Sequence, residues 1–179
     1  FIRIANHLNN CGLNAPEVFA ADPLNGILLL QDFGDGLFAK LMADDPSCQR
    51  ELYVGAVDVL LALHKCPMPD PIPAYPPLMP DLAALSLVWY RGGLLGENAE
   101  LVLALSSLMN DAITSLPARD DVLILRDYHS ENLLWLPGQT GLTKIGLLDF
   151  QDAMSGHAAY DLVSLTKDAR RDVPKNIAR

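Results

Sequence analysis

A proline-rich stretch at residues 66–80 constrains the fold of this chain more than any other feature. It reads CPMPDPIPAYPPLMP and contains seven prolines. Proline fixes φ and lacks an N–H donor, so such a stretch can form neither a helix interior nor a central strand. We therefore predict an extended connector across the surface, with separate structured segments on either side of it.

The segment before the connector is predicted to hold helices and one hairpin. Gly12 is a C-cap signal for the first helix. The pair Asn25-Gly26 between two apolar runs is typical of a β-hairpin. Pro46 ends a short helix, and Ser47 is expected to cap a long one. These elements are expected at residues 1–11, 16–22, 27–33, 37–42 and 47–66.

After the connector, Asp81 is expected to cap a helix over 81–91, and a second helix follows over about 97–116. The pattern then changes to short apolar runs typical of strands, before a last helix. These are expected at residues 122–125, 133–136, 144–150 and 158–169. Segregated elements of this kind indicate an α+β fold, and 179 residues are enough for about one domain.

Composition excludes several classes of partner. The net charge is −9, whereas nucleic acid and anionic membranes attract clustered Lys and Arg. No apolar run reaches the roughly 18 residues that span a bilayer. The cysteines, Cys11, Cys48 and Cys66, form no CxxC pair, so neither a zinc site nor a disulfide framework is indicated. We expect a cytoplasmic protein, but composition names no substrate, and the sequence leaves its oligomeric state open.

A polar loop, LRDYHSEN at 125–132, separates two apolar runs. A tight turn needs fewer residues and prefers Gly, Asn or Asp. The loop is therefore either an ordinary solvated connection or a reactive surface held out by its strands.

Three residues of this region could act together. Asp127 and Asn132 share the loop, and Asp149 ends a later run. Because an antiparallel hairpin joins Asn132 to Asp149, we expect the two to lie close in space. Hard cations such as Mg²⁺ bind one or two carboxylates together with substrate phosphates. Asp127 would then remain free to orient a hydroxyl or accept its proton.

This spacing resembles a known family. Protein kinases use H-R-D-x-x-x-x-N followed, after a hairpin, by D-F-G, and this chain reads L-R-D-Y-H-S-E-N and then L-D-F-Q-D. With GHAAYDLVSL and DARRDVP, the chain resembles the aminoglycoside phosphotransferase-like branch of the kinase fold. Within that branch it looks most like the bacterial sugar kinases that act on the anomeric hydroxyl of N-acetylmuramate and N-acetylglucosamine.

The resemblance implies a kinase-like architecture of two lobes. Residues 1–33 would be the end of the small N-terminal lobe up to the hinge, and residues 34–179 the catalytic lobe, with further helices beyond them. The backbone C=O of Gln31 and N–H of Phe33 would contact the adenine of ATP. The chain has neither the Gly-rich loop nor the lysine that usually precede its first helix, so it looks like a fragment, and we expect it to be weak or inactive alone.

The resemblance also implies a role for each polar residue of the site. Asp127 resembles the catalytic base, and Asn132 and Asp149 resemble the ligands of Mg²⁺. Asp161 resembles a buried carboxylate that supports the catalytic loop through backbone N–H groups. Leu125 departs from the pattern, because the family usually has His there.

Two further loop residues are candidates for contact with the substrate. His129 either binds substrate or is a solvated loop residue, and Arg126 either binds substrate or pairs with a nearby acid. The function implied is an ATP- and Mg²⁺-dependent kinase of an amino sugar in cell-wall recycling. There are two alternatives. One is a kinase for an aminoglycoside, choline or another alcohol, and the other is a catalytically dead binding module of the same fold.

Overall fold

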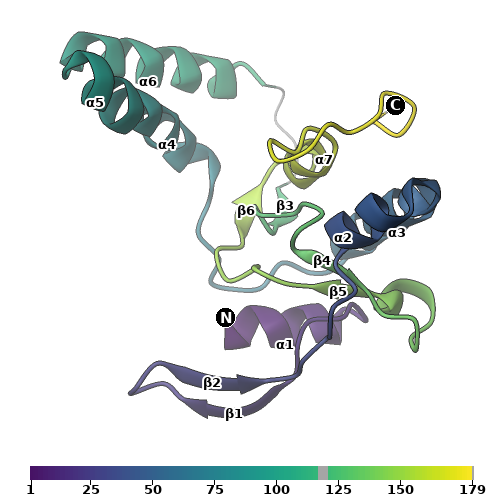
Figure 1. Cartoon of the computed structure of the whole chain (residues 1–179). Coiled ribbons are helices and arrows are strands. Elements are labelled where there is room, and N and C mark those ends of the chain that lie inside the picture. The colour runs from purple at the N-terminus through teal and green to yellow at the C-terminus, as the bar shows by residue number, and fades with distance from the viewer. Residues whose placement is uncertain (117–120, 179) are drawn as a thin grey trace.

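The computed structural model describes residues 1–116 and 121–178. Its helices and strands, drawn in Figure 1, are α1 Ile2–Asn10, β1 Val18–Asp22, β2 Ile27–Leu30, α2 Phe38–Asp44, α3 Gln49–Leu63, α4 Met79–Leu85, α5 Gly92–Leu95, α6 Ala99–Thr114, β3 Val122–Ile124, β4 Leu133–Trp135, β5 Ile145–Leu147, β6 Met154–Gly156 and α7 Ala159–Thr166.

The described strands form three separate antiparallel pairs rather than one sheet. These pairs are β1–β2, β4–β5 and β3–β6. The β1–β2 hairpin turns at the predicted Asn25-Gly26, where Gly26 has a φ of +69° that a side chain would disfavour. Helices and strands are therefore segregated, as the α+β prediction requires.

Strand β6 was not predicted. It is only three residues long, Met-Ser-Gly, and has no alternating or β-branched pattern. Two neighbours define it: β3 pairs with it on one side, and the proline-rich connector on the other. There the N–H of Tyr75 donates to the carbonyl of Ser155 at 2.8 Å, and the N–H of Ser155 donates to the carbonyl of Pro73 at 2.8 Å. The first part of the connector thus has no helix, as predicted, and it also completes this small sheet. The prediction was wrong for its end, because Pro76–Leu78 form a 3₁₀ turn and α4 begins at Met79.

Two predicted helix starts were wrong. Helix α4 begins at Met79, before Asp81, because Pro80 lies in the first turn, where a helix tolerates proline. A 3₁₀ turn at Pro46–Cys48 precedes α3, and its cap is Asp45, whose carboxylate accepts the N–H of Ser47 at 2.9 Å. Ser47 therefore does not cap the long helix.

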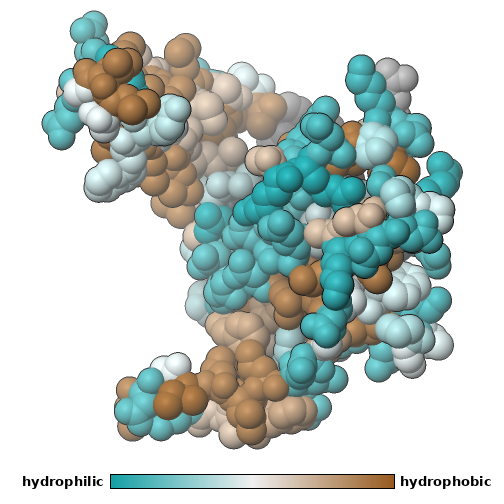
Figure 2. Space-filling model, in the orientation of Figure 1, coloured by the Kyte–Doolittle hydropathy of each residue, from teal (hydrophilic) through white to brown (hydrophobic). Residues whose placement is uncertain are grey.

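Helices α4, α5 and α6 project from the rest of the molecule as an arm (Figure 1). A π-helical segment, Ser86–Arg91, continues α4. No residue of α6 is buried, although its sequence places Leu101, Leu105 and Leu108 on one face as an apolar stripe. Trp89 and Tyr90 are 75% and 77% exposed, whereas an aromatic pair near a helix end is more often part of a core. Figure 2 shows hydrophobic side chains gathered on this arm.

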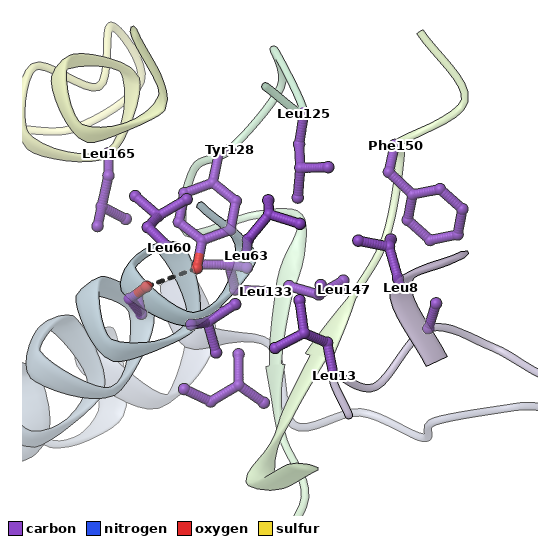
Figure 3. Packing of buried hydrophobic residues seen from close by; sticks show 14 of the residues in the cluster. Leu8, Leu13, Leu60, Leu63, Leu125, Tyr128, Leu133, Leu147, Phe150 and Leu165 are labelled. Carbon is purple, nitrogen blue, oxygen red and sulfur yellow. Dashed lines mark hydrogen bonds between the residues drawn. The ribbon is translucent and has the colours of Figure 1, made fainter. Parts of the chain in front are cut away.

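The hydrophobic core lies directly beneath the polar loop 125–132 (Figure 3). Leu60 and Leu63 of α3 belong to the same buried cluster as Leu133 of β4 and Leu147 of β5. Tyr128 extends from the loop into this cluster, so the loop backbone rests on the core. Among the described residues, no helix is long and apolar enough to cross a membrane.

Candidate functional site

A buried carboxylate fixes the start of the loop. Asp161, in the first turn of α7, is fully buried. Its two oxygens accept the N–H of Leu125 at 2.7 Å and the N–H of Arg126 at 2.9 Å. These are the contacts that the resemblance implies for Asp161. They help hold Arg126 at a φ of +73°, a conformation that costs free energy in a non-glycine residue.

Burial also perturbs the ionisation of Asp161. Loss of hydration raises its pKa to about 6, and the negative charge of Asp127 acts in the same direction. The two N–H donors lower the pKa, because they stabilise the charged form. Since burial outweighs the donors, keeping this carboxylate ionised at neutral pH costs folding free energy.

We predict that Asp161→Asn changes how stability depends on pH. The folded-state pKa is raised, so the contribution of this carboxyl to stability is largest below about pH 3.8 and is lost as the pH rises to about 6. The asparagine variant lacks that titration. Relative to the variant, the wild type should therefore lose about 2 kcal/mol between pH 4 and pH 7. Urea unfolding of both proteins across this range measures the difference, and parallel curves would contradict the prediction.

A second anchor lies next to Asp127. The hydroxyl of Tyr128 donates to the carbonyl of Ala56 in α3 at 2.8 Å, inside the core. Burial raises the pKa of Tyr128 well above its ordinary value, so the hydroxyl stays protonated. The half-buried carboxylate of Asp127 takes part in no side-chain hydrogen bond or ion pair of residues 1–116 and 121–178. It is therefore available as a hydrogen-bond acceptor.

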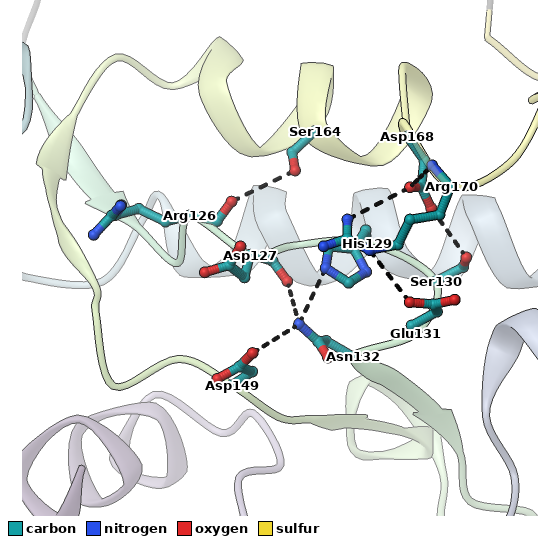
Figure 4. A network of polar contacts seen from close by, with 10 residues as sticks. All are labelled: Arg126, Asp127, His129, Ser130, Glu131, Asn132, Asp149, Ser164, Asp168 and Arg170. Carbon is teal, nitrogen blue, oxygen red and sulfur yellow. Dashed lines mark hydrogen bonds and ion pairs between the residues drawn. The ribbon is translucent and has the colours of Figure 1, made fainter. Parts of the chain in front are cut away.

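Asn132 and Asp149 lie together, as the hairpin predicted (Figure 4). Leu133 pairs with Leu147 across β4 and β5, and the N–H of Leu148 donates to the backbone carbonyl of Asn132 at 3.0 Å. The side-chain nitrogen of Asn132 lies 3.4 Å from Oδ2 of Asp149. The same nitrogen lies 3.0 Å from the backbone oxygen of Asp127, so the three residues form one cluster.

The backbone at Asp149 is fixed by its neighbours. Asp149 is exposed and has a φ of +55°. Phe150 is fully buried and stacks on Phe1 with ring centroids 4.9 Å apart. The side-chain amide of Gln151 donates to the other oxygen of Asp149. The buried Phe150 thus anchors the segment while the carboxylate remains at the surface.

The donors at this cluster fit Mg²⁺. Among the described residues there is no group of three or more His, Cys, Asp or Glu side chains that could hold a metal on its own. The cluster instead offers one amide oxygen, from Asn132, and one carboxylate, from Asp149. Mg²⁺ is commonly held by one or two such hard oxygen ligands, with water and substrate phosphates completing its shell.

The segment expected to contact adenine passes close to β5. The phenyl ring of Phe33 covers Gly146, where a Cβ would lie 2.7 Å from Cδ2 of that ring. The N–H of Gln31 donates to the carbonyl of Glu17 at 2.8 Å. In the described part of the chain, no backbone hydrogen bond uses the carbonyl of Gln31 or the N–H of Phe33. These are the two groups that the resemblance assigns to adenine.

The side chains of Arg126 and His129, the two candidates for contact with substrate, have surroundings that differ from those of the Asp127 carboxylate. The guanidinium of Arg126 lies over the ring of Tyr75, 4.9 Å from its centroid, rather than beside an acid. The hydroxyl of Tyr75 lies 3.0 Å from that of Tyr160. His129 is 4% exposed and is therefore not a solvated loop residue.

Sequence reasoning missed a second carboxylate that holds the loop. Asp168, after α7, is buried and accepts the hydroxyl of Ser130 at 3.2 Å and the N–H of Arg170 at 2.9 Å. Arg170 also forms an ion pair with Glu131 at 3.3 Å. The motif DARRDVP holds the relevant residues, but nothing in it indicates that Asp168 is turned inward toward the loop.

A comparison with protein families agrees with this geometry. The model of the phosphotransferase enzyme family, APH, matches residues 1–179. The chain belongs to this family. The resemblance inferred from the loop and hairpin motifs is thereby confirmed at the level of the family.

Similar proteins carry a more specific name. The chain is 38% identical, over 97% of its length, to an N-acetylmuramate/N-acetylglucosamine kinase from Caulobacter vibrioides, and covers 50% of that protein. It is 30% identical, over 94% of its length, to a kinase of the same name from Pseudomonas aeruginosa, and covers 49% of it. The chain thus spans about half the length of these curated relatives.

Solved structures show the same fold. A gentamicin complex of an aminoglycoside phosphotransferase matches 98% of the chain with a TM-score of 0.65 at 14% identity, and the match covers 60% of that structure. A choline/ethanolamine kinase family protein from Mesorhizobium loti matches 97% with a TM-score of 0.64 at 17% identity, over 54% of its own chain. The chain therefore has the α+β kinase-like fold of these phosphotransferases.

Proposed function

We propose that this chain carries the catalytic part of a kinase that transfers the γ-phosphate of ATP to the anomeric hydroxyl of N-acetylmuramate or N-acetylglucosamine. The cluster of Asp127, Asn132 and Asp149 carries the kinase part of the proposal, because it joins a free carboxylate to two oxygen ligands suited to Mg²⁺. The names of the relatives at 38% and 30% identity support the choice of sugar. The likeness to aminoglycoside and choline kinases supports only the fold, because identity there is 14–17%.

In this proposal Asp127 orients the acceptor hydroxyl and accepts its proton, since its carboxylate has no competing partner in the described structure. Asn132 and Asp149 hold Mg²⁺, which neutralises charge on the phosphates when bound. The residues do little covalent chemistry. Their contribution is to position the hydroxyl and to stabilise the charge that develops in the transition state.

The nucleotide is proposed to bind where residues 1–33, as the end of the small lobe, meet residues 34–179. The carbonyl of Gln31 accepts from adenine and the N–H of Phe33 donates to it. In the described structure neither group makes a backbone hydrogen bond, which supports this role. A cytoplasmic location and a part in recycling cell-wall sugars complete the proposal.

A phosphate-transfer screen of the full-length protein tests the function. We expect ATP-dependent phosphorylation of N-acetylmuramate and N-acetylglucosamine, and little transfer to choline or an aminoglycoside. Blocking the anomeric hydroxyl as a methyl glycoside should abolish transfer, because that hydroxyl is the proposed nucleophile. Equal transfer to the methyl glycoside would place the phosphate on another hydroxyl. Transfer to none of the four acceptors would favour a binding module that has lost catalysis.

A further inference from the structure

The buried imidazole of His129 bears on how Asn132 is oriented. His129 is 4% exposed, so a substrate has little access to its ring. Its Nε2 lies 3.2 Å from the side-chain nitrogen of Asn132. That nitrogen also lies 3.0 Å from the backbone oxygen of Asp127 and 3.4 Å from Oδ2 of Asp149. Three acceptors therefore surround one NH₂ group, which has only two hydrogens to donate.

The backbone carbonyl of Asp127 determines the orientation of the Asn132 amide. A carbonyl oxygen can only accept a hydrogen bond, so the atom that faces it must be the NH₂ nitrogen and not Oδ1. With its hydrogens directed to the two nearest acceptors, Asp127 O and His129 Nε2, the amide is held at two points. Oδ1 of Asn132 accepts no hydrogen bond within residues 1–116 and 121–178. Both of its lone pairs are then free.

The same geometry selects the form of the imidazole. Nε2 of His129 can accept from Asn132 only in a neutral ring whose proton is on Nδ1. The other tautomer would set two donors face to face at 3.2 Å. Nδ1 is itself buried and has no hydrogen-bond partner among the described residues. The ring therefore has one polar contact there, and that contact is with Asn132.

We propose that His129 is a positioning residue that fixes the orientation of the Asn132 amide and so keeps Oδ1 free as a ligand for the divalent cation. The inference rests on the proposed function, because it requires Asn132 to be a metal ligand. Without the acceptor at His129, one of the two points that hold the amide is lost, and the amide can turn so that Oδ1 is no longer kept free for the cation. Removing partners that orient a metal ligand typically weakens metal affinity or activity by about 10- to 100-fold.

Binding of Mn²⁺ to the full-length protein in the presence of ADP tests this role without relying on turnover. His129→Phe keeps a planar ring of similar volume but has no acceptor, whereas His129→Gln can present Oε1 close to the position of Nε2. We expect His129→Phe to weaken Mn²⁺ binding by about tenfold or more. His129→Gln should recover most of that loss. In the kinase assay, His129→Phe should lower kcat and leave KM for the acceptor sugar unchanged.

The outcomes separate this role from the others open to His129. Wild-type Mn²⁺ affinity in His129→Phe, with a raised KM for the sugar, would overturn the inference and make His129 a substrate contact. If His129→Phe does not fold, as judged by near-UV circular dichroism, His129→Gln decides alone. Near-wild-type Mn²⁺ affinity then supports the role, and a tenfold loss overturns it. Absence of Mn²⁺–ADP binding in the wild type would overturn the proposed function and the inference with it.

Discussion

Replacing Asp127 by alanine in the full-length protein should lower kcat by about 10³-fold while leaving the fold intact. The carboxylate is half-buried and has no side-chain partner in the described structure, so no structural contact is lost with it. A positioned general base typically contributes 10²- to 10⁴-fold to a rate. Steady-state kinetics with ATP and N-acetylmuramate measures the loss, and urea unfolding checks that stability is unchanged within about 1 kcal/mol.

Asp121→Asn is a matched control for charge, because Asp121 is an exposed carboxylate just before β3. It should retain wild-type kinetics. Wild-type turnover by Asp127→Ala would refute the proposed base. A loss of activity accompanied by loss of stability would instead point to a structural role for Asp127.

Replacing Asp149 by asparagine is expected to be almost as damaging, but through the metal. Asparagine tolerates the left-handed backbone that Asp149 adopts at a φ of +55°, so the backbone can stay in place. The substitution removes the only charged ligand proposed for Mg²⁺. We expect kcat to fall by about 10²- to 10³-fold and the Mg²⁺ concentration for half-maximal rate to rise, because a cation site loses its main anionic donor.

A Mg²⁺ titration of the rate at fixed ATP distinguishes this loss from that of Asp127→Ala, which should keep the wild-type Mg²⁺ requirement. Asp152→Asn serves as the control here, since Asp152 is an exposed carboxylate three residues further on. An unchanged Mg²⁺ requirement in Asp149→Asn would show that Asp149 does not bind the cation in the working enzyme.

The proximity of Asn132 and Asp149 could be predicted because it follows from local rules. Apolar runs at 133–136 and 144–150 with a turn between them specify an antiparallel hairpin, and a hairpin brings its outer ends together. In the structure, Leu133 pairs with Leu147 at the outer ends of this hairpin, next to Asn132 and Asp149. The kinase-like fold followed from the same motifs, because their spacing is specific even though each alone is common.

Other features could not be predicted, because they depend on contacts far away in the sequence. Strand β6 exists through its pairing with β3 and the connector, not through its own residues. The inward turn of Asp168, which accepts the hydroxyl of Ser130, likewise depends on where the segment after α7 packs against the loop. Helical periodicity correctly indicated α6, yet periodicity cannot say whether an apolar stripe will be covered. In the structure that stripe, like Trp89 and Tyr90, stays exposed.

The contacts that hold the polar loop have a consequence for hydrogen exchange. The hydrogen bond from Tyr128 to Ala56 spans 72 positions, and those from Leu125 and Arg126 to Asp161 span 36 and 35. The amide hydrogens of Leu125 and Arg126 are protected by a side chain of α7 rather than by a neighbouring strand. Their exchange with solvent therefore requires α7 to undock. The exchange rate of these two amides thus measures the free energy with which α7 closes over the loop.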